Sequence, residues 1–352
     1  MLKKIAVFNH KGGVSKTTTS FNLGWSIARR NKKVILIDAD SQCNLTLYVL
    51  GYNNYSDFYE TNNDNNIYNS LAPAFKSQPR LIEPVNCLSV SRNENLLLLP
   101  GHLDFSENEV QLGISLQLSN AFGSMQNLPG AFSYLINETA RKYNADYVIV
   151  DMNPSLSAIN QDILMSCNYF LVPTSPDFFS VMAIRSLARI LPNWEKWAKN
   201  ARPMLAQATY PLPIETPKFL GYTINDFNLS NGKPQHSFKA IIDNISNEVE
   251  NTFVPALDEV GMLLNKNLYT EAYDEMIAKS NNNNLNYNNI YCLAQISNFN
   301  KLIAISNKHS IPIFEIKLEY SEENQQKTLN WFKFLFSTFA ERVIRLTNYD
   351  KC

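Results

Sequence analysis

Residues 10–20 read HKGGVSKTTTS and separate a short apolar run at 4–9 from a helix-like stretch at 16–30. Gly12 and Gly13 can adopt backbone angles closed to other residues, so successive N–H groups of the turn can point inward toward phosphate oxygens. Lys16 adds a positive charge for the β- and γ-phosphates, and the Thr17 hydroxyl is a suitable Mg²⁺ ligand. A strand, a Gly-Gly turn and a helix in this order predict a phosphate-binding loop at a helix N-terminus.

Similar apolar runs recur along the chain, with helix-like stretches between several of them. They lie at 33–39, 96–99, 147–151, 169–173, 219–224 and 311–316. Strands that alternate with helices favour a mostly parallel, twisted sheet with helices on both faces. We therefore predict an α/β fold with right-handed crossover connections.

Two Asn- and Tyr-rich stretches interrupt this alternation, at 52–95 and 228–290. A length of 352 residues fits either two domains or one large α/β domain with insertions. We predict a single domain over 1–352 with an insertion or elaborated loop at 52–95 and a partly flexible insertion at 228–290. Within the second, Asn281 to Asn284 read as a flexible connector, because a polar tract buries little apolar surface.

The composition excludes several classes of protein. Lys and Arg total 31 against 32 Asp and Glu, so no whole-chain charge attracts nucleic acid or anionic lipid. The five cysteines are widely spaced and form no Cys-x-x-Cys pair, which favours neither a zinc site nor a disulfide framework and fits a reducing cytoplasm. No run of eighteen apolar residues is present, so we expect no membrane span.

Acidic residues follow two of the predicted strands. Asp38 and Asp40 end the run at 33–39, and Asp151 ends the run at 147–151. Carboxylates at the carboxyl ends of parallel strands face the crevice where ligands bind in such sheets. An Asp in this position can also simply cap the next helix, so both roles remain open for Asp40.

The loop resembles the deviant Walker A motif of the ParA/MinD family of P-loop ATPases, in its Soj-like ParA branch. That motif reads Lys-Gly-Gly-x-Gly/Ser-Lys-Ser/Thr, whereas the general Walker A pattern would place glycine at His10 and at Ser15. The segment from Asp38 to Thr46 resembles the family's D-x-D-P-Q-x-N-L-T, with Ser41 in place of proline. The resemblance implies ATP and Mg²⁺ as ligands, and a signature lysine, here Lys11, that reaches the partner's phosphates in an ATP-bound homodimer.

The resemblance also assigns roles to individual residues. Asp40 would orient or activate the attacking water, with Lys11 and Lys16 as the other catalytic residues. Thr17, Asp38 and Asp151 would organise Mg²⁺. Asn225 would contact adenine, and the segment after Asp151 would sense the γ-phosphate. The phosphates would lie on the loop, formed by Lys11, Gly12, Gly13, Val14, Ser15, Lys16, Thr17 and Thr18.

The function implied by the resemblance is a switch ATPase whose slow hydrolysis, stimulated by an adaptor or activating partner, positions or partitions DNA or another cargo. The alternative is a nucleotide-binding interaction module in a defence or plasmid-maintenance system, with little or no turnover. Arg185 and Arg189 would share one helix face, which fits either non-specific DNA binding or a merely solvated surface. The aromatic stretch at 331–339 follows core spacing and has no lysine-rich face, so we expect it to pack on the sheet rather than anchor to a membrane.

Overall fold

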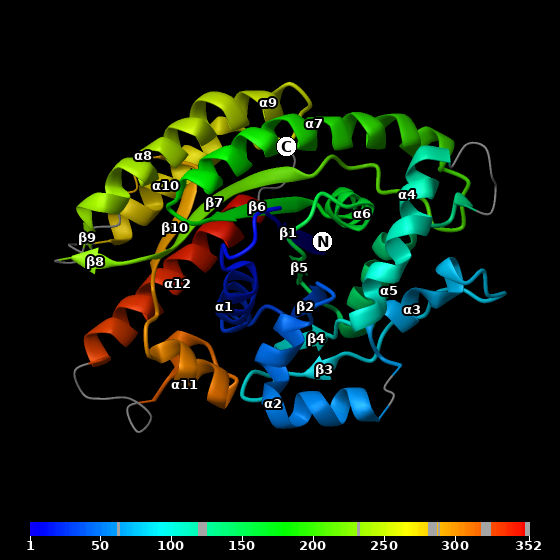
Figure 1. Ribbon diagram of the computed structural model, residues 1–352, viewed down its shortest axis with the longest axis horizontal. Helices are drawn as coiled ribbons and strands as arrows, with labels where there is room; N and C mark the ends of the chain where they lie inside the picture. Colours follow the sequence, from blue (N-terminus) through cyan, green and yellow to red (C-terminus); the bar gives the residue numbers. More distant parts are fainter. Residues whose placement is uncertain are drawn as a thin grey trace.

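The computed structural model describes residues 1–61, 64–118, 125–230, 233–280, 287, 289–317 and 325–348. An eight-stranded sheet of order β10-β7-β6-β1-β5-β2-β4-β3 runs through the molecule (Figure 1). Neighbouring strands are parallel except β3 and β4. The strands are β1 Lys3–Val7, β2 Val34–Ala39, β3 Leu88–Ser89, β4 Leu96–Leu99, β5 Tyr147–Met152, β6 Tyr169–Thr174, β7 Lys218–Phe227 and β10 Cys292–Ser297; β8 Leu229–Ser230 and β9 Lys233–Pro234 form a separate pair.

The central strands are apolar over most of their length because both of their faces are covered. The sequences VILIDA of β2, LLLL of β4 and YVIVDM of β5 are buried at every position. These strands, together with β1, β6 and β7, confirm the predicted α/β fold. Gly24 on α1 lets that helix lie close to β2, since a Cβ there would come within 2.5 Å of Leu36 Cδ2.

The predicted strand at 311–316 is wrong. This segment contains a 3₁₀ turn, η4 Ile313–Glu315, which packs against α12, and the edge strand is β10 at 292–297 instead. Ile311, Ile313 and Phe314 are buried, but helices cover them and the Ile313 N–H donates to Asn22 Oδ1 rather than to a strand. A short apolar run signals burial and does not by itself distinguish a strand from another buried segment.

Helices lie on both faces of the sheet, as the strand order requires. The β1-to-β2 and β5-to-β6 connections run in opposite directions along the sheet, so right-handed crossovers place α1 and α6 on opposite faces. Helix α1 packs with α12 and α2, and α6 packs with α4, α5 and α7 (Figure 1). The helices are α1 Lys16–Ala28, α2 Asn44–Glu60, α3 Ile67–Phe75, α4 Asn108–Leu118, α5 Ala131–Tyr143, α6 Ala158–Ser166, α7 Phe178–Met204, α8 His236–Glu248, α9 Val254–Asp258, α10 Lys266–Lys279, α11 Leu302–His309 and α12 Gln326–Thr347.

The two stretches predicted as insertions contain several helices. The first holds the end of α2, then α3 and the short edge strand β3, and the second holds α8, the π-helical turn η3 (Val249–Phe253), α9 and α10. Helices α8 and α9 pack on α7, and α10 packs on α12. The predicted connector Asn281 to Asn284 lies outside the described residues. The insertion boundaries stay a prediction.

The C-terminal helix α12 packs on the core, as its spacing predicts. Phe332, Phe336 and Phe339 are fully buried, and the helix contacts α1 and β10. The buried guanidinium of Arg342 donates to the carbonyl oxygens of Cys292 and Ile290 and so ties α12 to the start of β10. Among the residues that the structure describes, no helix is both long and apolar enough to cross a bilayer.

Candidate functional site

The loop between β1 and α1 has the backbone conformation of an anion nest. Gly13 has φ +70°, and Ser15, the N-cap of α1, has φ 60° and ψ 37°. Alternating left-handed residues turn successive N–H groups toward one side, where the helix dipole adds positive potential. Ser15 therefore occupies a left-handed position that glycine adopts with less strain, which explains why the general Walker A pattern requires glycine there.

Two residues that were not predicted as site residues join this loop to strand β6 and to the residue that follows it. Asn9 is fully buried; its Nδ2 donates to the Pro173 carbonyl at 2.7 Å, and its Oδ1 accepts from the Lys11 N–H at 3.0 Å. Ser175 Oγ donates to the Gly13 carbonyl at 3.3 Å. Both contacts join segments more than 160 residues apart, so no local pattern could have revealed them.

Lys16 lies inside the loop, at the position predicted for the phosphate-binding lysine. Its side chain is 8% exposed, and Nζ donates to the Lys11 carbonyl at 3.1 Å. Burial lowers the pKa of Lys16, whereas the nearby carboxylates of Asp151 and Asp40 raise it. A desolvated ammonium at the N-terminus of a helix strongly attracts a polyanion.

The structure brings Thr17, Asp38 and Asp151 together. Asp38 and Asp151 are register partners on adjacent strands, and both are fully buried. The Asp151 carboxylate accepts from the Ser20 hydroxyl at 3.0 Å and from Thr17. Burial raises the pKa of Asp151 to about 6 and, with the charge of Asp151 beside it, raises the pKa of Asp38 to about 7.

Asp38 already has several protein donors. Its Oδ2 accepts from the backbone N–H of Thr46 at 2.8 Å and from the Thr46 hydroxyl at 2.7 Å. The same hydroxyl accepts from the Gly101 N–H at 3.0 Å. Asp38 thus orients the turn that carries Asp40, and its predicted role beside Mg²⁺ stays a prediction.

Asp40 does not cap the following helix. The N-cap of α2 is Cys43, whereas Asp40 Oδ1 accepts from the Gln42 N–H at 2.9 Å and closes the turn before that helix. Asp40 is 8% exposed and lies close enough to Lys16 to affect its pKa. The carboxylate is therefore at the loop, as the sequence predicts for a group that acts on water there.

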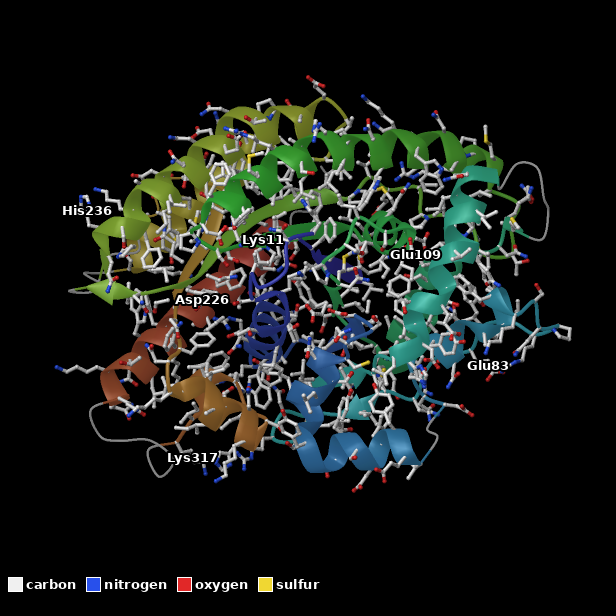
Figure 2. All side chains as sticks on the ribbon, viewed as in Figure 1. Lys11, Glu83, Glu109, Asp226, His236 and Lys317 are labelled. Carbon is white, nitrogen blue, oxygen red and sulfur yellow. The ribbon has the colours of Figure 1, made fainter. Side chains whose placement is uncertain are left out.

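The Lys11 side chain pairs with a carboxylate that lies outside the loop. Its Nζ forms an ion pair with Asp177 Oδ2 at 2.5 Å, and the Lys11 and Asp177 side chains are 18% and 41% exposed. Figure 2 labels Lys11 on the ribbon. Asp177 is also the N-cap of α7, since its Oδ1 accepts from the Ser180 N–H at 2.9 Å. Lys11 is therefore paired with a carboxylate of its own subunit.

Asn225 lies at the end of β7, next to the loop. Its Nδ2 donates to the Val14 carbonyl at 2.9 Å, while its buried Oδ1 has no hydrogen-bond partner among the residues that the structure describes. Asn225, Thr18 and Asp226 are among the residues that line a cavity of about 40 Å³. An unpaired buried acceptor fits the exocyclic amine of adenine, which is a hydrogen-bond donor.

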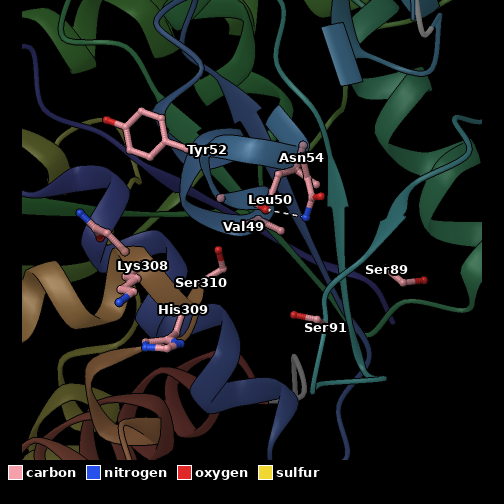
Figure 3. A pocket seen from close by; sticks show the side chains of 11 residues that line it. Val49, Leu50, Tyr52, Asn54, Ser89, Ser91, Lys308, His309 and Ser310 are labelled. Atoms are coloured by element: carbon pink, nitrogen blue, oxygen red, sulfur yellow. Dashed lines mark hydrogen bonds between the residues drawn. The ribbon is translucent and has the colours of Figure 1, made fainter. Parts of the chain in front are cut away.

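A larger groove, of about 570 Å³, lies elsewhere, between α2, β3 and the end of α11 (Figure 3). Gly51, Ser91 and Lys308 are among its lining residues, and it shares no residue with the phosphate loop. None of the described residues that line it is a carboxylate. Lys16, Asp40 and Asp151, which are suited to nucleotide chemistry, lie outside this groove, at the strand ends.

The first strand of the parallel sheet is followed by a nest of backbone N–H groups and then by a helix that begins with Lys16 and Thr17. This arrangement defines a P-loop nucleotide-binding protein. Residues 2–204 match a family model that is described as an AAA domain. The match covers more than half of the chain. The chain therefore belongs to this family, and it is a ParA/MinD-like P-loop ATPase.

Individual relatives agree with this assignment. A ParA family protein of Chlamydia pneumoniae is 31% identical over 188 residues, which cover 53% of this chain and 64% of that protein. An uncharacterised protein of Methanocaldococcus jannaschii is 27% identical over 233 residues, 66% of this chain and 76% of that protein. Two relatives from Mycobacterium tuberculosis are 33% identical over 204 residues, which cover 58% of this chain and 55% of each relative. The chain therefore spans about half the length of these relatives.

Solved structures show the same fold over nearly the whole chain. The ATP complex of McdA from Cyanothece has a TM-score of 0.60 at 16% identity and covers 100% of this chain and 98% of that chain. The ParA of pNOB8 has a TM-score of 0.56 at 17% identity and covers 99% of each chain. The fold is therefore common to this chain and to proteins of the ParA type.

The buried carboxylates predict an unusual pH dependence of stability. The pKa of Asp38 is about 7 in the folded protein and near 3.8 in an ordinary environment, so the folded state binds more protons between these values. The free energy of unfolding should then fall as pH rises through this window, by at most roughly 4 kcal/mol from Asp38. Asp38→Asn should remove this pH-dependent contribution to the free energy of unfolding. The melting temperature of the variant minus that of wild type should therefore increase with pH when both proteins are measured in EDTA.

Asp57→Asn, on the exposed surface of α2, is the matched control and should show no such trend. A constant difference in melting temperature between Asp38→Asn and wild type across the window would contradict the prediction.

Proposed function

We propose that this protein is a dimerising switch that binds ATP with Mg²⁺, hydrolyses it slowly under the control of a partner, and positions or partitions DNA or another cargo. The observation that carries the proposal is the meeting of Lys16, Thr17, Asp40 and Asp151 at one nest of backbone N–H groups. A protein that only bound nucleotide would not need a carboxylate at Asp40.

Each residue of the site would perform a different part of the reaction. The loop N–H groups and Lys16 hold the phosphates and stabilise the negative charge that develops as the terminal phosphoryl group leaves. Asp40 orients a water molecule for attack and accepts its proton. Thr17 and Asp151 are suited to hold Mg²⁺, directly or through water, and the bound ion would neutralise phosphate charge. Asn225 Oδ1 accepts a hydrogen bond from the base.

Lys11 would complete the partner's site in a dimer. Its ion pair with Asp177 is partly exposed, and such pairs contribute only about 0–1 kcal/mol, so the phosphates of a second subunit can displace Asp177. A cation supplied in trans raises the rate of phosphoryl transfer by roughly a thousand-fold or more in comparable enzymes. Dimerisation would thereby control hydrolysis.

Lys11→Ala is expected to block dimerisation while leaving nucleotide binding within about two-fold of wild type, because among the described residues Lys11 Nζ pairs only with Asp177. Light scattering of wild type should give twice the monomer mass in ATP and the monomer mass in ADP. The Lys11→Ala variant should remain monomeric in both.

Lys239→Ala, which removes an exposed lysine from α8, is the control and should dimerise like wild type. Equal dimer mass for wild type and Lys11→Ala in ATP would overturn the role of Lys11. A wild type that binds ATP and Mg²⁺ but hydrolyses no more than an Asp40→Ala variant, even with DNA and its partner present, would favour the interaction-module alternative.

DNA binding through Arg185 and Arg189 stays a prediction, and several charges near them are engaged. Arg185 forms an ion pair with Glu248 at 2.9 Å, Lys199 donates to the Val260 carbonyl, and Arg202 pairs with the buried Glu195. Arg189 remains among the exposed basic side chains of α7. A salt titration of DNA binding by wild type and Arg189→Ala would measure its contribution.

A further inference from the structure

Glu109, on helix α4, binds the start of helix α6 with both carboxylate oxygens (Figure 2). The Ala158 N–H donates to Oε1 at 2.6 Å, and the Ile159 N–H donates to Oε2 at 3.1 Å. The Asn160 N–H donates to the Ser157 hydroxyl at 3.2 Å. The first three N–H groups of α6 therefore all have acceptors, and two of these come from a residue 49 positions earlier in the chain.

Helix α4 is held close to α6 and firmly to its surroundings. Gly113 lies one turn after Glu109, and a Cβ there would be 3.8 Å from Ala158 Cβ, which is van der Waals contact. Trp197 Nε1 donates to the Leu116 carbonyl at 2.8 Å and joins α4 to α7. Glu109 is thus a fixed anion at the positive end of α6 rather than a mobile surface side chain.

The first turn of α6 is in turn bonded to the segment that follows Asp151. Asn160 is fully buried, and its Nδ2 donates to the carbonyl oxygens of Asn153 at 3.0 Å and Ser155 at 2.7 Å. Asn153 lies two residues after Asp151, which contacts Thr17 and Ser20 of the phosphate-binding helix. Hydrogen bonds and short backbone segments therefore connect Glu109 with Asp151 and, through Asp151, with the first turn of α1.

We propose that Glu109 is a positioning residue: it fixes segment 153–157, which directly follows Asp151, and so sets the rate of ATP hydrolysis without touching the nucleotide. The proposal rests on the proposed function. Without the carboxylate, the Ala158 and Ile159 N–H groups lose their acceptors, and the turn bonded to Asn160 loses its anchor on α4. Displacement of groups near the reacting atoms by about 1 Å can slow a reaction by as much as a hundred-fold.

The test compares Glu109→Ala and Glu109→Gln with wild type and with Glu107→Ala. Glu107 is the matched control, because it precedes α4 by one residue and carries the same charge but contacts the Tyr68 hydroxyl instead. Three quantities are measured on the full chain: kcat for ATP, the dissociation constant for ATP with Mg²⁺, and hydrogen exchange of residues 153–160 with ADP and with ATPγS.

We expect Glu109→Ala to lower kcat roughly ten-fold, to leave the dissociation constant within two-fold, and to speed exchange of residues 153–160 roughly ten-fold. Glu109→Gln keeps one acceptor oxygen and should fall between Ala and wild type. Glu107→Ala should match wild type in all three measurements.

Two results would overturn the proposal. One is exchange of residues 153–160 in Glu109→Ala that equals exchange in Glu107→Ala. The other is a loss of kcat that comes with equal loss of ATP affinity and faster exchange throughout the chain, which would indicate general destabilisation. If wild type hydrolyses no more ATP than Asp40→Ala, the proposed function fails, and the exchange measurement still decides whether Glu109 positions the segment.

Discussion

Lys16→Ala is expected to weaken ATP binding by at least a hundred-fold. Lys16 is a buried cation inside the loop, and hydrogen bonds to charged groups contribute about 1.5–3 kcal/mol each. Loss of one or two such bonds to the β- and γ-phosphates corresponds to roughly 3 kcal/mol, or about a hundred-fold in the dissociation constant. Isothermal titration with ATP and Mg²⁺ measures the effect.

The matched control for this variant is Lys4→Ala. Lys4 is also a buried lysine, 6% exposed, but its Nζ lies near Ser133 and Asn137 rather than in the loop. The control should lose stability and keep its affinity for ATP. If both variants lose affinity equally, the loss reports damage to the fold and Lys16 does not hold the phosphates.

Asp40→Ala is expected to leave ATP binding within a few-fold of wild type and to lower the rate of hydrolysis by roughly a hundred-fold to ten-thousand-fold. That range is typical for removal of a general base, and Asp40 is the carboxylate predicted to act on water. Phosphate release under saturating ATP measures the rate, and titration with ATP measures the binding. The two together separate a catalytic role from a binding role.

Asp57→Ala, an exposed aspartate of the same helix-and-turn segment, is the control and should turn over at the wild-type rate. Hydrolysis by Asp40→Ala at the wild-type rate would remove Asp40 from the chemistry.

The sequence predicted the parts of the site that lie within short segments. The nest, Lys16 and Thr17 follow one strand, and Asp38, Asp40 and Asp151 end others, so a parallel sheet must bring them to one edge. The contacts that support them join distant segments: Asn9 with Pro173, Thr46 with Gly101, and Glu109 with α6. Since these partners meet only after folding, no spacing in the sequence could predict them.

The error at 311–316 has a similar origin. Its isoleucines have the burial of a strand, but helix α12 occupies the space above them and the edge of the sheet is formed by 292–297. The apolar composition of 311–316 therefore predicted that the segment is buried. Which of the two apolar runs, 292–297 or 311–316, forms the strand depended on packing elsewhere in the chain.

The contact between Lys11 and Asp177 has a consequence for encounters between subunits. Two empty subunits that collide each bring a lysine already neutralised by its own carboxylate, and neither offers an anion to exchange for it. Under the proposed function, Lys11 then contributes no electrostatic stabilisation to such collisions. Under the same proposal, Lys11 can exchange Asp177 for the phosphates of the partner only when the subunits carry nucleotide. Asp177 therefore disfavours dimers that form without nucleotide, for example through crowding alone.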